Sequence, residues 1–246
     1  MNKKTPLFYK FVKWLVWAFY PKFKVEGMEN LPDEPVIIVG NHSQTNGPVF
    51  SELHLPIPHQ TWCRGEMMHL KETPEYMFND FWGQKSRFSQ PFYKALAYLL
   101  SPLAAFIFKN ANTIAVYNDA RIMATFKASV RYLCEGESIV IFPEHDVKYN
   151  NIIYDFQDKF ISLARLYYKK TGKALKFVPL YIARNLKTAY IGKPIEFCPE
   201  SEKDAELGRI KQYLMDNVTL LASSAPEHIV VPYRNIKKRT YPKNTD

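Results

Sequence analysis

Two polar segments that lie far apart in the chain carry the side chains best suited to chemistry. Asn41-His42-Ser43-Gln44-Thr45-Asn46-Gly47-Pro48 follows an apolar run at 35–40, and Pro143-Glu144-His145 follows a second apolar run that ends at Phe142. Both runs are typical of buried strands. Because ligands of open α/β sheets bind beyond the carboxyl ends of strands, the two segments predict one site. His42 is the residue in it that we expect to handle protons.

The sequence after His42 predicts the start of a helix. Asn46, Gly47 and Pro48 combine a capping side chain or glycine with a proline that suits the first helical turn. Free backbone N–H groups at such a start stabilise negative charge. His42 beside them could take a proton from a hydroxyl, and the N–H groups could bind a phosphate or a developing oxyanion.

With these features, the chain resembles the glycerolipid (lysophosphatidic acid) acyltransferase family. Four matches to that family's motifs occur in the family's order over roughly residues 25–200: Asn41-His42, Arg64-Gly65-Glu66, Phe142-Pro143-Glu144 and Val178-Pro179-Leu180. The resemblance implies transfer of a fatty acyl group from acyl-CoA or acyl carrier protein to a hydroxyl of a lysophospholipid such as 1-acylglycerol-3-phosphate. It also implies that His42 is the general base, with substrate-binding roles for the family-motif residues Asn41, Arg64, Glu66, Phe142 and Pro143.

The chain departs from the family pattern at several positions. Gly47 stands where the family has the aspartate that orients the histidine, and loss of such a carboxylate can cost on the order of 10⁴ in rate. His145 replaces the glycine after Pro-Glu, and Asp146-Val147, followed by Lys148, replaces Thr-Arg. Asn118-Asp119 stands where an Asp-Arg pair is usual, so that Arg121 comes two residues late.

Two hypotheses follow from these departures. In the first, Asp146 or Glu144 replaces the missing acid beside His42, and Arg121 or Lys148 holds the acceptor's phosphate or another anion. Glu144 could instead brace the loop, and Arg121 and Lys148 could be plain surface charges. In the second hypothesis the dyad has decayed and the domain only binds lipid. A new His145-Asp146 pair beside the retained Pro-Glu favours the first.

Composition and charge indicate which kinds of partner the protein can be expected to bind. The net charge of +9 is concentrated at the two ends of the chain, and it suits nucleic acid, anionic lipid or an acidic carrier protein. A nucleic-acid partner is not expected, because no binding motif is present and the aromatic side chains follow apolar faces. The 3 cysteines share no metal or disulfide spacing, which favours free thiols in a reducing compartment, with Cys134 in the core. We expect no metal and no cofactor besides the acyl thioester co-substrate.

Residues 7–20 are typical of a helix that lies in the headgroup layer of a membrane. Phe8, Phe11, Leu15 and Phe19 form one stripe, with Lys10, Lys13 and Trp17 on another side. The alternative is a helix packed on the domain. Residues 95–108 form a second apolar stretch that Pro102 should break, either as a buried helix pair or as a shallow membrane wedge. We expect a peripheral or monotopic protein at the cytoplasmic face; the oligomeric state is left open.

Strands alternate with helices along the chain, which predicts a single α/β domain with a largely parallel central sheet flanked by helices. We place an amphipathic membrane segment at 1–24, an acyltransferase-like domain at 25–225 and a basic tail at 226–246. The expected strands are 35–40, 60–63, 113–117, 138–142, 176–183 and 188–197, the last interrupted at Pro194. The expected helices are 65–80, 121–135, 155–171 and one that Ser201 caps, with Leu207, Ile210, Leu214, Val218 and Leu221 buried.

Overall fold

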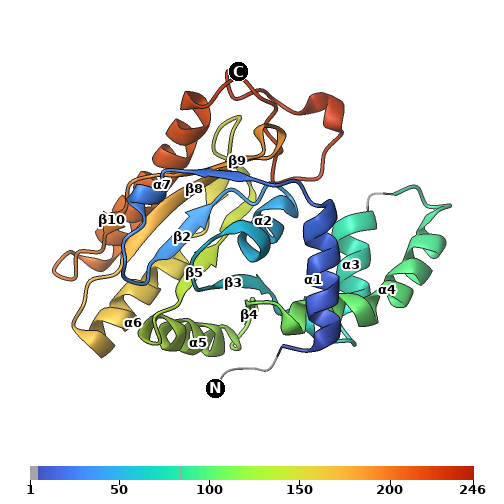
Figure 1. The fold of residues 1–246 in the computed structure, drawn as a ribbon, viewed down its shortest axis with the longest axis horizontal. Coiled ribbons are helices and arrows are strands. Elements are labelled where there is room, and N and C mark those ends of the chain that lie inside the picture. Colours follow the sequence, from blue (N-terminus) through green and yellow to red (C-terminus); the bar gives the residue numbers. More distant parts are fainter. Residues whose placement is uncertain (1–4, 84) are drawn as a thin grey trace. The chain divides into compact units, whose positions relative to one another are not determined.

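The computed structural model describes residues 5–83 and 85–246, and the chain forms two compact units. The first, here the helical unit, contains Trp62–Ala128 and the N-terminal segment up to Tyr20. The second, the sheet unit, contains Pro21–Thr61 and Ser129–Asp246. The predicted α/β class with a largely parallel central sheet flanked by helices is confirmed (Figure 1). Lys3 and Lys4 of the predicted N-terminal segment lie outside the described residues.

The strands of the sheet unit lie side by side in one sheet. The strand order is β1 (Lys24–Glu26), β9 (Thr188–Ile191), β8 (Lys176–Ala183), β2 (Ile37–Gly40), β5 (Ser138–Ile141) and β3 (His59–Arg64), with β3 continuing into the helical unit. β2 pairs in parallel with both β5 and β8, and Val39 lies opposite Ile141 and Pro179. The carboxyl ends of β2 and β5 therefore lie side by side, and the two polar segments follow at the same edge.

Burial explains the central strands. The side chains of Ile37, Ile38, Val39 and Val140 are 0% exposed, as is usual for parallel strands that are covered on both faces. Helix α7 (Lys203–Ser224) packs against β8 through the predicted stripe, of which Ile210, Leu214 and Val218 are fully buried. Helices α5 (Ile122–Cys134) and α6 (Ser162–Thr171) and the short antiparallel strand β10 (Ile195–Glu196) follow the order expected from the sequence.

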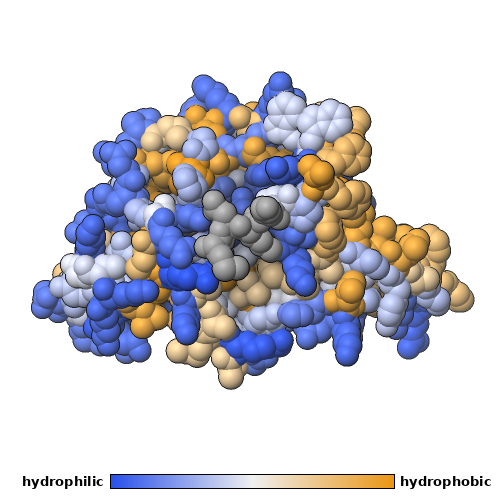
Figure 2. All heavy atoms as spheres, turned by 60° about the horizontal axis from the view of Figure 1, so that its bottom comes forward, coloured by the Kyte–Doolittle hydropathy of each residue, from blue (hydrophilic) through white to orange (hydrophobic). Residues whose placement is uncertain are grey.

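The helical unit has a small core and a large apolar surface. It contains α1 (Leu7–Phe19), α3 (Thr73–Met77), α4 (Gln90–Asn110) and strand β4 (Thr113–Val116). The ring centroids of Phe8 and Phe106 lie 5.4 Å apart, so α1 packs on α4. Within α1 only Tyr9 is buried. Figure 2 shows hydrophobic side chains gathered at the right of the view, where Figure 1 draws these helices.

Several predicted helices differ from the structure. Residues 155–171 do not form one helix: Tyr154–Phe156 is strand β7, paired with β6 (Glu144–Lys148), and α6 begins only at Ser162. Tyr154 and Phe156 are buried and Asp155 between them is less so, which is a strand alternation that the helical spacing concealed. Residues 65–80 are likewise split into the 3-10 helix Gly65–Met68, α3 and the π-helical turn Phe78–Trp82.

Local chemistry accounts for the smaller errors. Helix α4 continues through Pro102, where the Ser101 hydroxyl donates a hydrogen bond to the carbonyl of Ala97 at 2.5 Å. The cap of α7 is Glu202 instead of Ser201, because the Glu202 carboxylate accepts from Ala205 N at 2.8 Å. Cys134 is exposed, so its predicted place in the core is wrong.

Candidate active site

The turn that carries His42 has a strained backbone. Ser43 and Gln44 have φ values of 46° and 56°, in the left-handed region that residues with a side chain seldom adopt. Helix α2 (Asn46–His54) begins directly after it. Asn46 is not the expected cap, because Thr45 precedes the helix without a side-chain cap bond, and Asn46 Nδ2 donates to the carbonyl of Ser43 instead.

The first backbone N–H groups of α2 are already engaged in hydrogen bonds. Asn46 N donates to Ser43 O at 3.1 Å, Gly47 N donates to His42 O at 3.0 Å, and Pro48 has no N–H group. The helix start therefore offers fewer donors to an oxyanion than its sequence suggests.

His42 is the chemically unusual side chain of this turn. Its Nδ1 atom is buried and has no hydrogen-bond partner among the described residues, and the Ser43 hydroxyl beside it is buried and unpartnered as well. Burial lowers the pKa of His42 to about 4, an effect that the backbone of Gln44 partly offsets. The imidazole is therefore neutral at pH 7 and available as a proton acceptor. The rings of Phe142 and Tyr233 meet it edge-on, with centroids at 5.7 and 5.6 Å.

Glu144 holds the backbone of this site in place. Its Oε1 accepts from His42 N at 2.5 Å and its Oε2 accepts from Tyr154 N at 2.9 Å. The side chain is 3% exposed, and burial raises its pKa to about 7, although both backbone N–H groups lower it. Since both oxygens bond to backbone, the carboxylate braces the loop and leaves Nδ1 of His42 unsupported.

Asn41 anchors the same turn to the sheet. Its Oδ1 accepts from Ile182 N at 2.7 Å and its Nδ2 donates to Ile182 O at 3.3 Å, so it joins the end of β2 to β8. Together with Glu144 it fixes both residues of the Asn-His pair through buried backbone bonds. These contacts explain why the strained turn is tolerated.

Gly47 is closely packed and does not leave room for an aspartate. A Cβ atom at this position would lie 2.8 Å from the carbonyl oxygen of His42 and 2.8 Å from Cε1 of Phe142. Such contacts require a shift of backbone or ring. The packing around this position therefore favours a glycine.

The other polar residues of the second motif are engaged elsewhere. Asp146 pairs with Arg234 at 3.0 Å. His145 Nε2 lies 2.8 Å from Asp155 Oδ2, and the other oxygen of Asp155 lies 2.8 Å from Lys211 Nζ. Neither Asp146 nor His145 thus supports His42 in this arrangement. Lys148 is exposed at the end of β6.

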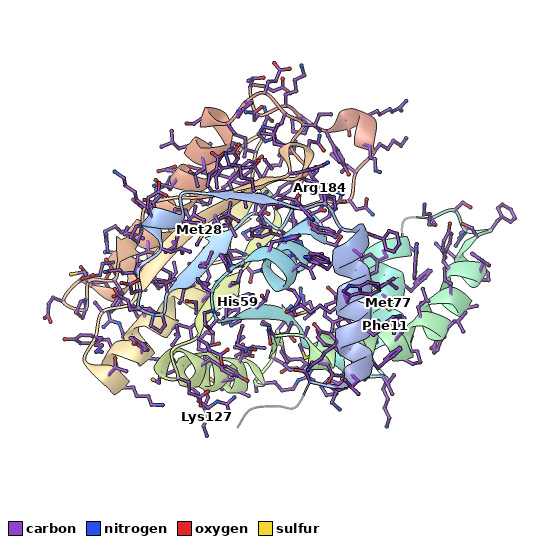
Figure 3. All side chains as sticks on the ribbon, in the orientation of Figure 1. Phe11, Met28, His59, Met77, Lys127 and Arg184 are labelled. Carbon is purple, nitrogen blue, oxygen red and sulfur yellow. The ribbon has the colours of Figure 1, made fainter. Side chains whose placement is uncertain are left out.

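The structure brings three residues to this site that the sequence analysis missed. Tyr233 covers His42 and also meets the ring of Tyr154 at 5.8 Å. Tyr241 accepts a hydrogen bond from Gln44 Nε2 at 2.9 Å. Arg184, which is labelled in Figure 3, follows the end of β8. Its Nε donates to Asn46 Oδ1 at 2.8 Å. The two tyrosines belong to the segment interpreted as a basic tail, and no local sequence signal links them to His42.

The remaining predicted site residues lie in the helical unit. Arg121 pairs with both oxygens of Asp119, with Nη2 to Oδ2 at 2.8 Å, and its guanidinium lies 3.7 Å from the ring centroid of Tyr117. The Tyr117 ring also packs over Gly65, between Arg64 and Glu66. Their role in one site with His42 stays a prediction.

A comparison with solved structures finds a similar fold. The 1-acyl-sn-glycerophosphate (LPA) acyltransferase PlsC from Thermotoga maritima superposes with a TM-score of 0.46 at 15% identity, over 90% of this chain and 84% of that one. No protein-family model and no curated protein sequence matches the chain. A likeness this distant does not establish a shared activity.

Two further observations bear on cofactors and membranes. Within residues 5–83 and 85–246, no group of three His, Cys, Asp or Glu side chains is placed to hold a metal ion. The metal-free site stays a prediction. In the same part of the chain, α4 is long and apolar enough to cross a membrane by length and composition, with 17% of its most apolar window buried.

Proposed function

We propose that this protein is an O-acyltransferase that acts at the cytoplasmic face of a membrane. It moves a fatty acyl group from acyl-CoA or acyl carrier protein to a hydroxyl of a lysolipid, of which 1-acylglycerol-3-phosphate is the example that the family resemblance implies. One observation carries the proposal: a neutral, partly buried His42 with an unpartnered ring nitrogen sits on a strained turn at the carboxyl end of β2. Buried polar groups without partners are rare and are typical of functional sites.

In the proposed reaction His42 acts as a general base. The imidazole takes the proton of the acceptor hydroxyl as the oxygen attacks the thioester carbonyl, and the carbonyl becomes an oxyanion. Collapse of this intermediate forms the ester and breaks the C–S bond. The proton then passes from the imidazolium to the leaving thiolate. The Ser43 hydroxyl, buried without a partner beside His42, is the donor that we assign to the oxyanion.

Glu144 is a positioning residue in this proposal and does not substitute for the missing aspartate. It holds His42 N and Tyr154 N, so its removal changes where the imidazole lies. Because no carboxylate raises the basicity of His42, we expect a slower reaction than an intact His-Asp dyad would give.

The membrane part of the proposal rests on α1 and α4. Phe8, Phe11, Leu15 and Phe19, the residues of the predicted apolar stripe, are 54%, 55%, 41% and 84% exposed, and Trp14 is 57% exposed. Lys10 on the same helix is exposed and suits anionic lipid. These side chains give the protein a peripheral or monotopic attachment to membrane lipids.

A non-catalytic lipid-binding domain is the second candidate. The observation in its favour is that Nδ1 of His42 has no carboxylate partner, as expected if the dyad had decayed. It differs from the first candidate in one measurable respect, since it predicts binding of vesicles without turnover.

The deciding experiment is acyl transfer by the wild type and by His42→Ala, with labelled acyl-CoA and acyl carrier protein against a panel of lysolipids. Transfer that the variant loses, and that a matched His54→Gln control retains, supports the enzyme. Unchanged transfer in His42→Ala would falsify the catalytic role. Folded wild type that binds vesicles but acylates nothing supports the second candidate.

A further inference from the structure

A polar cavity lies beside the candidate active site within the sheet unit. Its volume is about 310 Å³, at the lower end of the range for small-molecule sites. The hairpin of β6 and β7 forms one wall and the C-terminal tail forms the other. The lining includes Lys148, Asn151, Tyr154, Thr240, Tyr241 and Asp246.

The tail wall is held in place by buried hydrogen bonds. Ile229 and Lys243 form an antiparallel bridge, and Val230 N donates to Pro242 O at 2.9 Å. Asn244 is 4% exposed; its Oδ1 accepts from His228 N at 2.8 Å and its Nδ2 donates to Ala222 O at the end of α7 at 2.8 Å. The cavity is therefore built by the fold.

Two lining residues connect the cavity to the turn of His42, each through one intervening residue. The ring of Tyr154 lies 5.8 Å from that of Tyr233, which in turn lies 5.6 Å from the imidazole. Tyr241 accepts from Gln44, two residues after His42. The rings of Tyr154 and Tyr233 would thus lie between a ligand in the cavity and the proposed base.

The lining indicates what the cavity can bind. It offers one cation, Lys148, and one carboxylate, Asp246, so the formal charges of its walls cancel. The cation nearby, Arg234, is already paired with Asp146. A phosphate monoester carries about two negative charges at neutral pH and needs several cationic donors. The lining instead supplies amide and hydroxyl groups, which both donate and accept hydrogen bonds as sugar hydroxyls do.

We infer that this cavity is the head-group site of the acceptor lipid and that it takes an uncharged, hydroxyl-rich head group such as a hexosyl glycerol. The inference rests on the proposed acyltransferase function and replaces the phosphate head group that the family resemblance implies. The tail is then part of the substrate-binding site.

The test compares three acceptors: a lysolipid with a hexosyl head group, monoacylglycerol and lysophosphatidate. Thr240→Trp fills the cavity, and Arg239→Trp places the same ring on the neighbouring exposed residue. We expect the wild type to prefer the hexosyl acceptor, and Thr240→Trp to lower kcat/KM for it by about tenfold or more, equivalent to about 1.4 kcal/mol of binding. Transfer to monoacylglycerol and the Arg239→Trp control should change little. Asn151→Leu, with a thermal melt, provides a second variant if Thr240→Trp is unstable.

Other outcomes overturn the inference. A wild type that prefers lysophosphatidate, or equal losses in both tryptophan variants, would show that the cavity does not select the head group. If the wild type transfers to no acceptor, the acyltransferase proposal fails separately, and ligand-observed NMR with the soluble hexosyl glycerol and glycerol 3-phosphate tests the cavity. Binding of the hexosyl glycerol that Thr240→Trp abolishes supports it; absence of wild-type binding excludes it.

Discussion

The two clusters that the sequence placed in one site differ in how their backbone holds the polar atoms. Both keep buried polar atoms without partners among the described residues, which are Nδ1 of His42 and the Ser43 hydroxyl in the first cluster and one carboxylate oxygen each of Glu66 and Glu72 in the second. Around Arg121 the paired charges are about half exposed and neutralise one another. Around His42 the turn is strained and its backbone is firmly bonded to Glu144, so the first cluster is the better candidate.

The largest effect that separates the clusters is expected on catalysis. His42→Ala should lower acyl transfer by about 10²–10⁴, the usual contribution of a general base, because no neighbouring group can take its place. The measurement is kcat/KM with the best acceptor of the panel. A loss of similar size in Arg121→Ala would contradict the distinction between the two clusters.

The next effect is on stability. Glu144→Ala leaves two buried backbone N–H groups, those of His42 and Tyr154, without acceptors, which should lower the free energy of unfolding by roughly 3 kcal/mol. Urea denaturation measures this change. Glu72→Ala, at a half-exposed ion pair of the other cluster, is the matched control and should change stability little. Equal losses of stability in Glu144→Ala and Glu72→Ala would contradict the bracing role of Glu144.

The pH dependence of stability tests the burial of His42 and Glu144. The pKa of His42 falls from 6.5 to about 4 on folding, so the unfolded chain binds more protons between these values and stability rises with pH there. The pKa of Glu144 rises from 4.5 to about 7, so its contribution to stability falls with pH over that window. The two slopes oppose each other between pH 4.5 and 6.5 in the wild type.

Glu144→Gln removes the opposing contribution of the Glu144 carboxyl. The free energy of unfolding of this variant should therefore increase between pH 4 and 6.5 by up to about 3 kcal/mol, since one pKa unit corresponds to about 1.4 kcal/mol. Urea midpoints measured across this range provide the check. A flat profile in the variant would mean that the imidazole is not buried as described.

A smaller effect is expected at the apolar surface of the helical unit. Trp14→Ala removes a ring that is 57% exposed on α1 and should weaken binding to anionic vesicles by about tenfold. Leu220→Ala, an exposed apolar position of α7 in the sheet unit, should leave sedimentation with vesicles unchanged. Equal behaviour of the two variants would argue against a membrane role for α1.

The smallest effect concerns Arg121. Because its guanidinium already bonds Asp119 and stacks on Tyr117, Arg121→Lys should change KM for any acceptor by less than about threefold. A tenfold rise for lysophosphatidate alone would restore the phosphate-binding role that the family motif suggests.

The sequence predicted what depends on local pattern. The apolar runs at β2, β5 and β8 indicated buried parallel strands, and their carboxyl ends do bring His42 and Glu144 together. It could not predict β7, because the spacing of Phe156 and Phe160 fits a helix as well as it fits a strand followed by a turn. Nor could it place Tyr233 over His42, since that contact depends on how the tail returns from α7. The partners of Asp146 and His145 were hidden for the same reason.

The long span of the bracing bonds has a consequence for synthesis of the protein. Glu144 bonds His42 across 102 residues, and Asn41 bonds Ile182 across 141. At ordinary rates of translation, the ribosome needs on the order of ten seconds or more to supply these partners. During that time the apolar run before the turn stays uncovered, so a pause before β8 or a truncation there should favour aggregation over a partly working site.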